Sequence, residues 1–508
     1  MAVLFYWRSS VGENGNVAVF AFDADLTSGY KDPICSCKPI EEGQRNAMKL
    51  EFWGGAETVT GSQLLIRTSN GCLLRDCGLF QGRRRTAWEL NSTIPYPVKD
   101  LDTCIISHAH IDHLGNLPTL VKSGYDRPIW ATSATIALAE IMLKDAAHIQ
   151  EQDAAYLNQK KSRRGLPPVR PLYTVEDAER CLRLFREHNY HQLRVPLPGV
   201  EVEALEAGHI LGAALHRLRI SENGRTTTLG VAVDLGRKGL PLIRDPEILR
   251  QVDILIMEST YGGRLHASAE DARAELREVV HRTIERGGKV LIPTFALERA
   301  QELLFHLSSL IESGELKPVP VYVDSPMATA VTRVFQRQRE YLDEEYWQLR
   351  AQLASVMSPP WVHFVSSVEE SKQVTACREP CIVIAGSGMC EHGRILHHLK
   401  QGIEDSRNAV VIVGFQAQHT LGRRIVERAP EVSIFGEKYR LLAEVATLNA
   451  FSAHADRDEL VQYARATGAR RVMLVHGEPD QRESLAEVLR AEGIEVARPT
   501  RGTVLEIP

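Results

Sequence analysis

The sequence contains no Cys-x-x-Cys pair, although it holds 9 cysteines in 508 residues. Because such pairs and a secretory signal are both missing, we interpret the cysteines as reduced thiols of a cytoplasmic protein, not as a disulfide framework. Cys35 with Cys37, and Cys377 with Cys381, could bind a metal, but incidental or buried cysteines are the simpler interpretation.

Long apolar runs and an excess of basic charge are missing as well. No apolar stretch approaches the roughly 20 residues that a membrane-spanning helix needs. The apolar start from Met1 to Trp7 is too short for a signal core. The 60 Lys and Arg residues are outnumbered by 65 Asp and Glu residues, so the net charge is -5. This balance argues against a general basic coat, and any polyanion is expected to bind in a local groove.

The size and composition are typical of a soluble protein with two or three domains: 508 residues, of which 44% are hydrophobic and 25% charged. Residues 1–47 differ from the rest, because Gly, Pro and Cys follow no clear period there. A strand-like segment, Lys49–Phe52, begins just after Met48. We therefore expect residues 1–47 to be an extension of unknown role and Met48 to be the functional start.

Two kinds of patterning follow along the chain. Up to Glu258 short strands dominate, interrupted by helical patterns at Ser133–Ala147 and Val175–Phe185. The strands are predicted at Gln63–Thr68, Leu73–Asp76, Thr103–Ser107, Val200–Leu205, Leu215–Ser221, Thr226–Val233 and Asp253–Met257. From about Gly262, strands alternate with helices, which predicts a parallel sheet with crossover connections. Residues 150–173 are polar and Pro-rich, and the basic run at 160–164 is interpreted as a solvated loop in preference to a phosphate contact.

The densest group of metal-ligating residues is the run His108-Ala109-His110-Ile111-Asp112-His113, between a predicted strand and a helix expected from Gly115. Metals such as zinc favour imidazole nitrogen and carboxylate oxygen at this density. Neither a strand nor a helix places all four side chains on one face. We expect a loop turned around two metals, with the first two histidines on one ion and the Asp-His pair on the next. A polar loop that happens to be rich in histidine is the alternative.

Further candidate ligands stand at the ends of other predicted strands, namely Asp76, His209, Asp234 and His476. Each of them alone is more often a capped strand end or a satisfied polar residue. Together with the His108 loop they predict one shared site, where loops converge on an edge of the sheets.

At these residues the chain resembles the metallo-β-lactamase superfamily and, within it, the β-CASP nucleases. The β-CASP resemblance runs through Glu258-Ser259-Thr260-Tyr261-Gly262, Gly386-Ser387-Gly388-Met389, Phe451-Ser452-Ala453-His454-Ala455-Asp456 and Leu474-Val475-His476-Gly477. It covers Met48 to the C-terminus. It looks most like the cleavage-and-polyadenylation endonuclease branch, in a bacterial type without KH domains.

The resemblance implies an α/β fold: a metallo-β-lactamase αββα sandwich with an inserted β-CASP domain, itself a parallel sheet flanked by helices. The expected division is 48–261 for the first part of the metallo-β-lactamase domain, 262–445 for the β-CASP domain and 446–508 for the C-terminal part of the first domain. The insertion agrees with the change of pattern near Gly262.

The resemblance also implies a site with two Zn²⁺ per chain. His108, His110 and His209 would hold the first ion, Asp112, His113 and His476 the second, with Asp234 bridging them. Two such ions lower the pKa of a water between them and stabilise both oxygens of an in-line displacement. Asp76 would orient ligands or the water, and Glu258 with His454 would position the phosphate or protonate the leaving oxygen. Asp112, Asp76, Glu258 and His454 are thus the expected catalytic residues.

Substrate contacts are less specific in the sequence. Backbone N–H groups of Gly386, Ser387 and Gly388 could hold a phosphate, or the segment could be only a tight turn. On the helix expected at Glu391–Leu399, His392, His397 and His398 are expected to face solvent. The run Arg83-Arg84-Arg85 could anchor phosphates, although a solvated loop is the default interpretation.

The implied function is a zinc-dependent ribonuclease that cuts single-stranded RNA, mainly internally, through a hydroxide between the metals. The products would be 3′-hydroxyl and 5′-phosphate ends. His476 favours RNA, because DNA-acting relatives tend to carry valine at that motif. The alternatives are a 5′-3′ exoribonuclease, a DNA-acting nuclease, a small thioester or lactam hydrolase, and a non-catalytic scaffold. The inserted domain argues against the small-molecule hydrolase, and the complete ligand set argues against the scaffold. No membrane partner is expected, and the sequence leaves a homodimer open.

Deletion of residues 1–47 is expected to leave a chain that folds and keeps its hydrolytic activity, because every motif lies after Met48. Circular dichroism and a nuclease assay on the two forms would measure this. Loss of both folding and activity on deletion would contradict it.

Overall fold

The computed structural model describes residues 48–162, 168–266, 269–353, 355–414, 416–417, 419–448 and 452–507. The predicted extension at 1–47 and the end of the basic run, Arg163 and Arg164, lie outside the described residues, as do Phe415 and Phe451.

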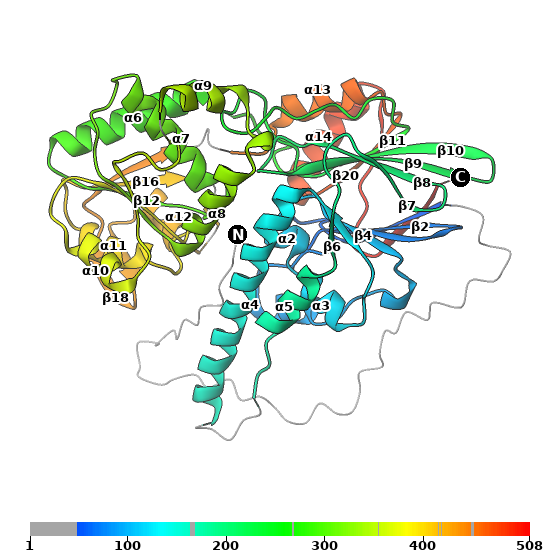
Figure 1. Cartoon of the computed structure of the whole chain (residues 1–508), viewed down its shortest axis with the longest axis horizontal. Helices are drawn as coiled ribbons and strands as arrows, with labels where there is room; N and C mark the ends of the chain where they lie inside the picture. Colours follow the sequence, from blue (N-terminus) through cyan, green and yellow to red (C-terminus); the bar gives the residue numbers. More distant parts are fainter. Residues whose placement is uncertain are drawn as a thin grey trace.

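The first lobe is a sandwich of two seven-stranded sheets (Figure 1). The first has the order β22-β1-β2-β3-β4-β5-β6 and the second β21-β20-β11-β10-β9-β8-β7. The strands of the first sheet are β22 (Thr503–Ile507), β1 (Met48–Gly54), β2 (Gln63–Thr68), β3 (Gly71–Arg75), β4 (Thr103–Ile105), β5 (Ile129–Ala131) and β6 (Phe185–Glu187). Those of the second are β21 (Glu495–Ala497), β20 (Arg471–Val475), β11 (Ile254–Glu258), β10 (Arg225–Ala232), β9 (Ala214–Glu222), β8 (Val200–Glu206) and β7 (Leu193–Leu197).

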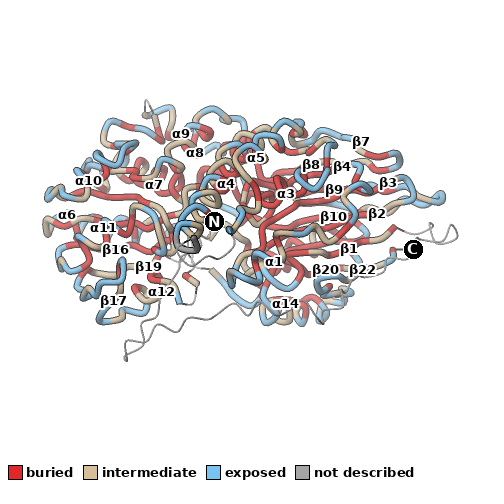
Figure 2. Tube along the Cα trace, turned by 90° about the horizontal axis from the view of Figure 1, so that it is seen from below, coloured by how far each residue is buried: buried red, intermediate tan, exposed pale blue. Residues whose placement is uncertain are grey.

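Alternation along the strands explains why the sheets stack and why helices cover their outer faces. On β2, Leu64 and Ile66 join the core between the two sheets, whereas Leu65 points to the opposite face and packs in the core beneath the helices. On β11, Ile254 likewise packs in the core between the two sheets, and Leu255 packs in the core beneath the helices. Figure 2 shows the buried strands running through the interior of both lobes. The helices of this part are α1 (Arg84–Asn91), α2 (Ile111–Leu114), α3 (Leu117–Lys122), α4 (Ser133–Ser162), α5 (Val175–Leu182), α13 (Arg457–Thr467) and α14 (Pro479–Ala491), with a 3₁₀ turn at Val98–Asp100.

The second lobe is built on a six-stranded sheet of order β14-β13-β15-β12-β16-β19, in which every pair is parallel. Its strands are β12 (Val290–Pro293), β13 (Val321–Asp324), β14 (Val362–Phe364), β15 (Ile382–Ala385), β16 (Ala409–Val413) and β19 (Glu444–Leu448), and a hairpin of β17 (Glu431–Ile434) and β18 (Glu437–Arg440) lies beside it. Its helices are α6 (Ala269–Glu285), α7 (Arg299–Glu312), α8 (Pro326–Arg337), α9 (Glu344–Gln352), α10 (Val368–Ala376), α11 (Ile395–Gly402) and α12 (Leu421–Val426), with a 3₁₀ turn at Arg339–Tyr341.

The chain enters this lobe after β11 and leaves it before β20, yet β11 and β20 are parallel neighbours in the second sheet. The middle of the chain is thus inserted into the sandwich, and the blue segment that begins at Met48 and the red C-terminal segment meet in the other lobe, where β1 pairs with β22 (Figure 1). The predicted α/β fold with an inserted parallel sheet is confirmed. The predicted domain limits stay a prediction, and the one at 445 falls inside β19, a strand of the inserted sheet.

Several predicted helices have different limits in the structure, and α5 ends at Leu182 instead of Phe185. Helix α4 was expected to end at Ala147 but runs on to Ser162, because the segment after Ala147 contains neither proline nor glycine and is rich in Ala, Gln, Glu and Lys, which favour helices. Helix α11 begins at Ile395 instead of Glu391, because Gly393 has a left-handed φ of 79° that a continuing helix cannot contain.

Candidate metal centre

The polar residues that the sequence singled out follow strands whose carboxyl ends meet at one edge of the sandwich. His108 follows β4, Asp234 follows β10 and His476 follows β20. In the second sheet β10, β11 and β20 are parallel to one another, and in the first β3 and β4 are parallel. Strands that run in one direction end at one edge, which brings residues from distant parts of the chain together.

Backbone contacts fix the loop that carries the histidine cluster. The Ser62 N–H donates to the Asp112 carbonyl at 2.8 Å, and the Cys77 N–H to the His113 carbonyl at 2.8 Å. Gly78 permits this approach, since a Cβ there would lie 1.6 Å from the Asp112 carbonyl oxygen. Asp112 and His113 were expected on a loop, but they lie on a single helical turn, α2, which ends just before Gly115. The helix expected from Gly115 begins at Leu117, as α3.

The first cluster contains His108, His110, His209 and Asp234, whose ligand atoms all lie within 4.8 Å of one another. His110 Nδ1 is 3.0 Å from His108 Nε2 and 3.2 Å from His209 Nε2. The Asp234 Oδ2 is 3.2 Å from His108 Nε2 and 3.5 Å from His209 Nε2. The three histidines expected around the first ion thus direct ring nitrogens toward a common point.

The second cluster contains Asp112, His113 and His476. The Nε2 atoms of His113 and His476 are 3.3 Å apart, and His476 Nε2 is 3.8 Å from Asp112 Oδ2. The same Asp234 Oδ2 that faces the first cluster lies 3.3 Å from His113 Nε2. Asp234 therefore stands between the two clusters, which is the position of a bridging ligand.

These separations fit a metal ion. Ring nitrogens bound tetrahedrally to zinc at about 2.0–2.1 Å lie about 3.3–3.4 Å apart, close to the nitrogen separations seen here. Burial lowers the pKa of His110 and His209, which favours the neutral imidazole that ligates a metal. Burial also opposes protonation of His113, but Asp234 and Asp76 raise its pKa to about 9, so these carboxylates favour positive charge at the second cluster.

Asp76 supports the second cluster from behind. Its Oδ2 lies 2.8 Å from His113 Nδ1, which leaves Nε2 of that ring free to face the site. The Ser107 N–H and hydroxyl both donate to Asp76, at 2.8 and 2.9 Å, and Arg75 Nη1 donates at 2.7 Å. Burial opposes ionisation of Asp76, but Arg75 and His113 outweigh it and lower the pKa of this carboxyl. The carboxylate therefore fixes the orientation of the His113 ring.

Glu258 and His454 form a pair next to the clusters. His454 Nδ1 is 3.1 Å from both carboxylate oxygens of Glu258, which is fully buried. Burial opposes protonation of His454, but Glu258 outweighs it and raises the pKa of the imidazole. The His454 ring lies 4.6 Å from that of His209, centre to centre. The ring thus stands at the first cluster with its Nδ1 occupied by a carboxylate, an arrangement suited to proton transfer from Nε2.

Several side chains at the site were given no role from the sequence. The Ser107 Oγ lies 3.0 Å from His108 Nδ1, and the Thr260 hydroxyl donates to the His476 carbonyl at 3.0 Å. Ser107 directly precedes His108 and Thr260 lies inside the Glu258–Gly262 motif, and these positions are the signal from which a role could have been predicted. Arg75, which neutralises Asp76, had no signal beyond its place in a strand.

The predicted substrate contacts lie elsewhere, in the inserted lobe or on the surface. The Ser387 hydroxyl accepts hydrogen bonds from the Glu391 and His392 N–H groups, as expected of a tight turn. Phosphate binding by Gly386, Ser387 and Gly388 stays a prediction. His397 is exposed as expected, whereas His398 is buried 2.7 Å from Asp324 because it shares the inward face of α11 with Ile395 and Leu399. The expectation that His398 faces solvent is wrong. Arg85 is 91% exposed and pairs with Glu89.

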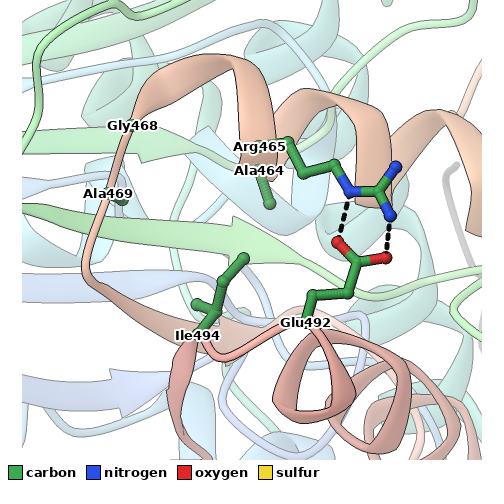
Figure 3. A pocket seen from close by; sticks show the side chains of 6 residues that line it. All are labelled: Ala464, Arg465, Gly468, Ala469, Glu492 and Ile494. Carbon is green, nitrogen blue, oxygen red and sulfur yellow. Dashed lines mark hydrogen bonds and ion pairs between the residues drawn. The ribbon is translucent and has the colours of Figure 1, made fainter.

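A separate cavity of about 490 Å³ lies between the ends of α13 and α14 (Figure 3). Arg465 and Glu492 pair across it. Its residues Gly468 and Ala469 precede β20, whereas His476 follows that strand. The cavity is therefore at the opposite edge of the sheet and does not belong to the metal centre.

Comparison with protein families agrees with this geometry. Residues 57–191 match the model of the metallo-beta-lactamase superfamily, residues 300–425 the Beta-Casp domain, and residues 438–499 the Zn-dependent metallo-hydrolase RNA specificity domain. A ribonuclease of Thermus thermophilus is 37% identical over 89% of this chain and 98% of its own length. The transcription termination factor FttA of Methanocaldococcus jannaschii is 31% identical over 87% of this chain and 69% of its own, and an RNase J-like protein of that organism is 30% identical over 90% and 99%.

Among solved structures, a protein of unknown function from Enterococcus faecalis has a similar fold, with a TM-score of 0.52 and 13% identity, over 91% of this chain and all of that one. Across the part of the chain that the structure describes, no helix has the length and apolar character needed to cross a bilayer.

The substitution Asp76→Asn is expected to weaken metal binding by about 10- to 100-fold, because His113 loses the charged acceptor that fixes its ring. Equilibrium dialysis with metal analysis measures this. Asp324→Asn is the matched control: Asp324 is equally buried and contacts His398 at 2.7 Å, but in the other lobe. Equal loss of metal in both variants would contradict a specific role of Asp76.

Proposed function

The chain belongs to the β-CASP family of the metallo-β-lactamase superfamily, and from this premise we propose that it is a zinc-dependent endoribonuclease that hydrolyses single-stranded RNA. The coarser statement, a metallo-hydrolase of the ribonuclease type, follows from the three matched domains and from the ribonuclease relative, which aligns over 98% of its length. Zinc, the number of ions, the internal mode of cutting and the single-stranded substrate are the parts that we propose.

One observation supports the proposal most. The Asp234 Oδ2 lies 3.2 Å from His108 Nε2 and 3.3 Å from His113 Nε2, and so it faces both clusters. The donor set is five imidazoles and two carboxylates, which suits zinc better than the oxygen-preferring Mg²⁺ or Ca²⁺. We therefore propose two Zn²⁺ per chain, held by His108, His110, His209, Asp112, His113 and His476, with Asp234 bridging. Bound there, two such ions would make water nucleophilic near neutral pH and stabilise charge on a phosphodiester.

The protein's own residues would handle the proton of the leaving group. Glu258 holds His454 by Nδ1 and favours its charged form, so that Nε2 can give a proton to the departing 3′-oxygen. Water adds across the P–O3′ bond, and the products carry a 3′-hydroxyl and a 5′-phosphate. The 2′-hydroxyl is not needed as a nucleophile in this scheme.

The inserted lobe supports a polymeric substrate in preference to a small ester. The carboxyl ends of its parallel strands are directed toward the metal centre: β12 leads into a loop that contacts the His209 loop, and β19 leads toward His454. Carboxyl-end loops of such sheets are the usual place for phosphate-bearing ligands, and Gly386, Ser387 and Gly388 belong to this edge. We propose these three as the substrate-binding residues.

Replacement of His454 by alanine is expected to lower kcat on single-stranded RNA by about 10²- to 10⁴-fold, the usual share of a general acid. Bound zinc should stay unchanged, since the predicted ligands remain. End-labelled single-stranded RNA and DNA, run on one gel, give the rate, the substrate type and the cleavage mode.

The matched control is His397→Ala, which removes an exposed histidine of the inserted lobe and should leave the rate unchanged. Internal fragments with 5′-phosphates would agree with the proposal. Release of mononucleotides from one end of the RNA would show an exonuclease instead. A 2′,3′-cyclic phosphate product, or full activity after chelation, would contradict the metal-dependent hydrolysis.

A further inference from the structure

One contact joins the inserted lobe directly to the loop that carries His209. The Leu211 N–H donates to the Glu298 Oε2 at 3.1 Å. Glu298 belongs to the connection between β12 and α7 and is 6% exposed. The His209 loop is short and closed on itself, since Ala207 N–H donates to the Ala213 carbonyl at 3.0 Å. A contact at Leu211 therefore acts two residues from the predicted ligand.

Glu298 occupies a backbone conformation that favours glycine. Its φ is 68° and its ψ is -59°, and the Arg299 N–H donates to the Leu297 carbonyl at 2.9 Å. This is a γ-turn with positive φ, a rare and strained form. A strained residue next to a candidate site persists only where its surroundings hold it, and it calls for a functional explanation.

Glu298 precedes α7, but its side chain makes no capping hydrogen bond to that helix that would offset the strain of the turn. The neighbouring Arg299 pairs with Glu302. Burial, reinforced by the charge of Glu302, raises the pKa of Glu298 to about 8. Glycine would fit the turn better, so the carboxyl group is accounted for by its contact with the His209 loop.

A second carboxyl group holds the same loop from the other side. Glu206, at the end of β8, accepts a hydrogen bond from the Gly208 N–H at 3.0 Å. His209 is thus bracketed by two acceptors, one from the metallo-β-lactamase sheet and one from the inserted lobe. Glu206 reaches a residue directly before His209, and Glu298 reaches one shortly after it.

We propose that Glu298 is a positioning residue by which the inserted lobe orients His209 for the first metal ion. The inference rests on the proposed metal centre. It assigns to the insertion a role in metal affinity, in addition to any contact with substrate. The carboxylate of Glu298 accepts from the Leu211 N–H, which is not a predicted metal ligand, so its effect on His209 would pass through the loop from Ala207 to Ala213.

The test compares Glu298→Gly with Glu298→Gln, each as the full chain. Glycine relieves the positive φ but removes the acceptor, whereas glutamine keeps an oxygen for the Leu211 N–H. Zinc affinity is measured by competition with a chromophoric chelator, and the melting temperature of the metal-free protein is measured in parallel. We expect Glu298→Gly to bind the zinc ion of the His209 cluster about 10- to 100-fold less tightly, the usual effect of losing an outer partner of a metal ligand.

The melting temperature should separate this role from a merely structural one. Metal-free Glu298→Gly is expected to melt within a few degrees of the unsubstituted chain, because the relief of strain in the turn offsets the similar cost of leaving the buried Leu211 N–H without its acceptor. Glu298→Gln should keep zinc affinity within about threefold, as a retained acceptor implies. The matched control is Gln251→Gly, which relieves a positive φ of 58° at an exposed position outside the centre and should leave zinc binding unchanged.

Unchanged zinc binding in Glu298→Gly would overturn the inference, and so would an equal loss in Glu298→Gln. If the unsubstituted chain binds no zinc, the proposed metal centre itself fails. Two zinc ions in the unsubstituted chain together with normal binding in Glu298→Gly would leave the proposed function intact and overturn only the role of Glu298.

Discussion

The buried carboxylate of Asp234 is the feature on which the rest of this structure depends. It is 2% exposed and faces imidazoles of both clusters. A buried negative charge that lacks positive partners is strongly destabilising. Burial opposes protonation of His113, but Asp234 and Asp76 raise its pKa to about 9, so this imidazole supplies positive charge when no metal ion is bound. A bound cation would balance the same carboxylate and leave the imidazoles neutral, as metal ligands must be. The site's three left-handed backbone positions, at Asp76, Asp234 and His476, show that the chain accepts conformational cost to aim these side chains.

The second constraint is that the centre can form only in the complete fold. His476 lies beyond the inserted lobe in the sequence, and its strand β20 reaches the site by pairing with β11, the last strand before the insertion. His454 likewise arrives at Glu258 from the end of that lobe. The Glu298 contact adds a direct link. If Glu298 positions the His209 loop as proposed, metal binding and the docking of the inserted lobe would be coupled through the Leu211–Glu298 contact.

The parallel sheet of the second lobe follows from strand–helix alternation, and the gathering of the predicted ligands follows from polar residues at strand ends. The sandwich and the insertion were expected only from the family resemblance. Strand β2 has the limits that its apolar pattern indicates, Gln63–Thr68. Features that depend on tertiary contacts could not be predicted from the sequence pattern. The burial of His398 is fixed by Asp324, 74 positions away in the chain, and the strained turn at Glu298 has no local signature. The end of α4 was predicted too early, at Ala147, because the residues that follow are polar and polar segments are typical of loops.

The most direct test of the two-metal centre is anomalous diffraction at the zinc absorption edge from crystals of the zinc-loaded protein. The account predicts two peaks per chain, both next to the Asp234 carboxylate. One should lie among His108, His110 and His209, and the other among Asp112, His113 and His476. A single peak, or peaks away from Asp234, would contradict it.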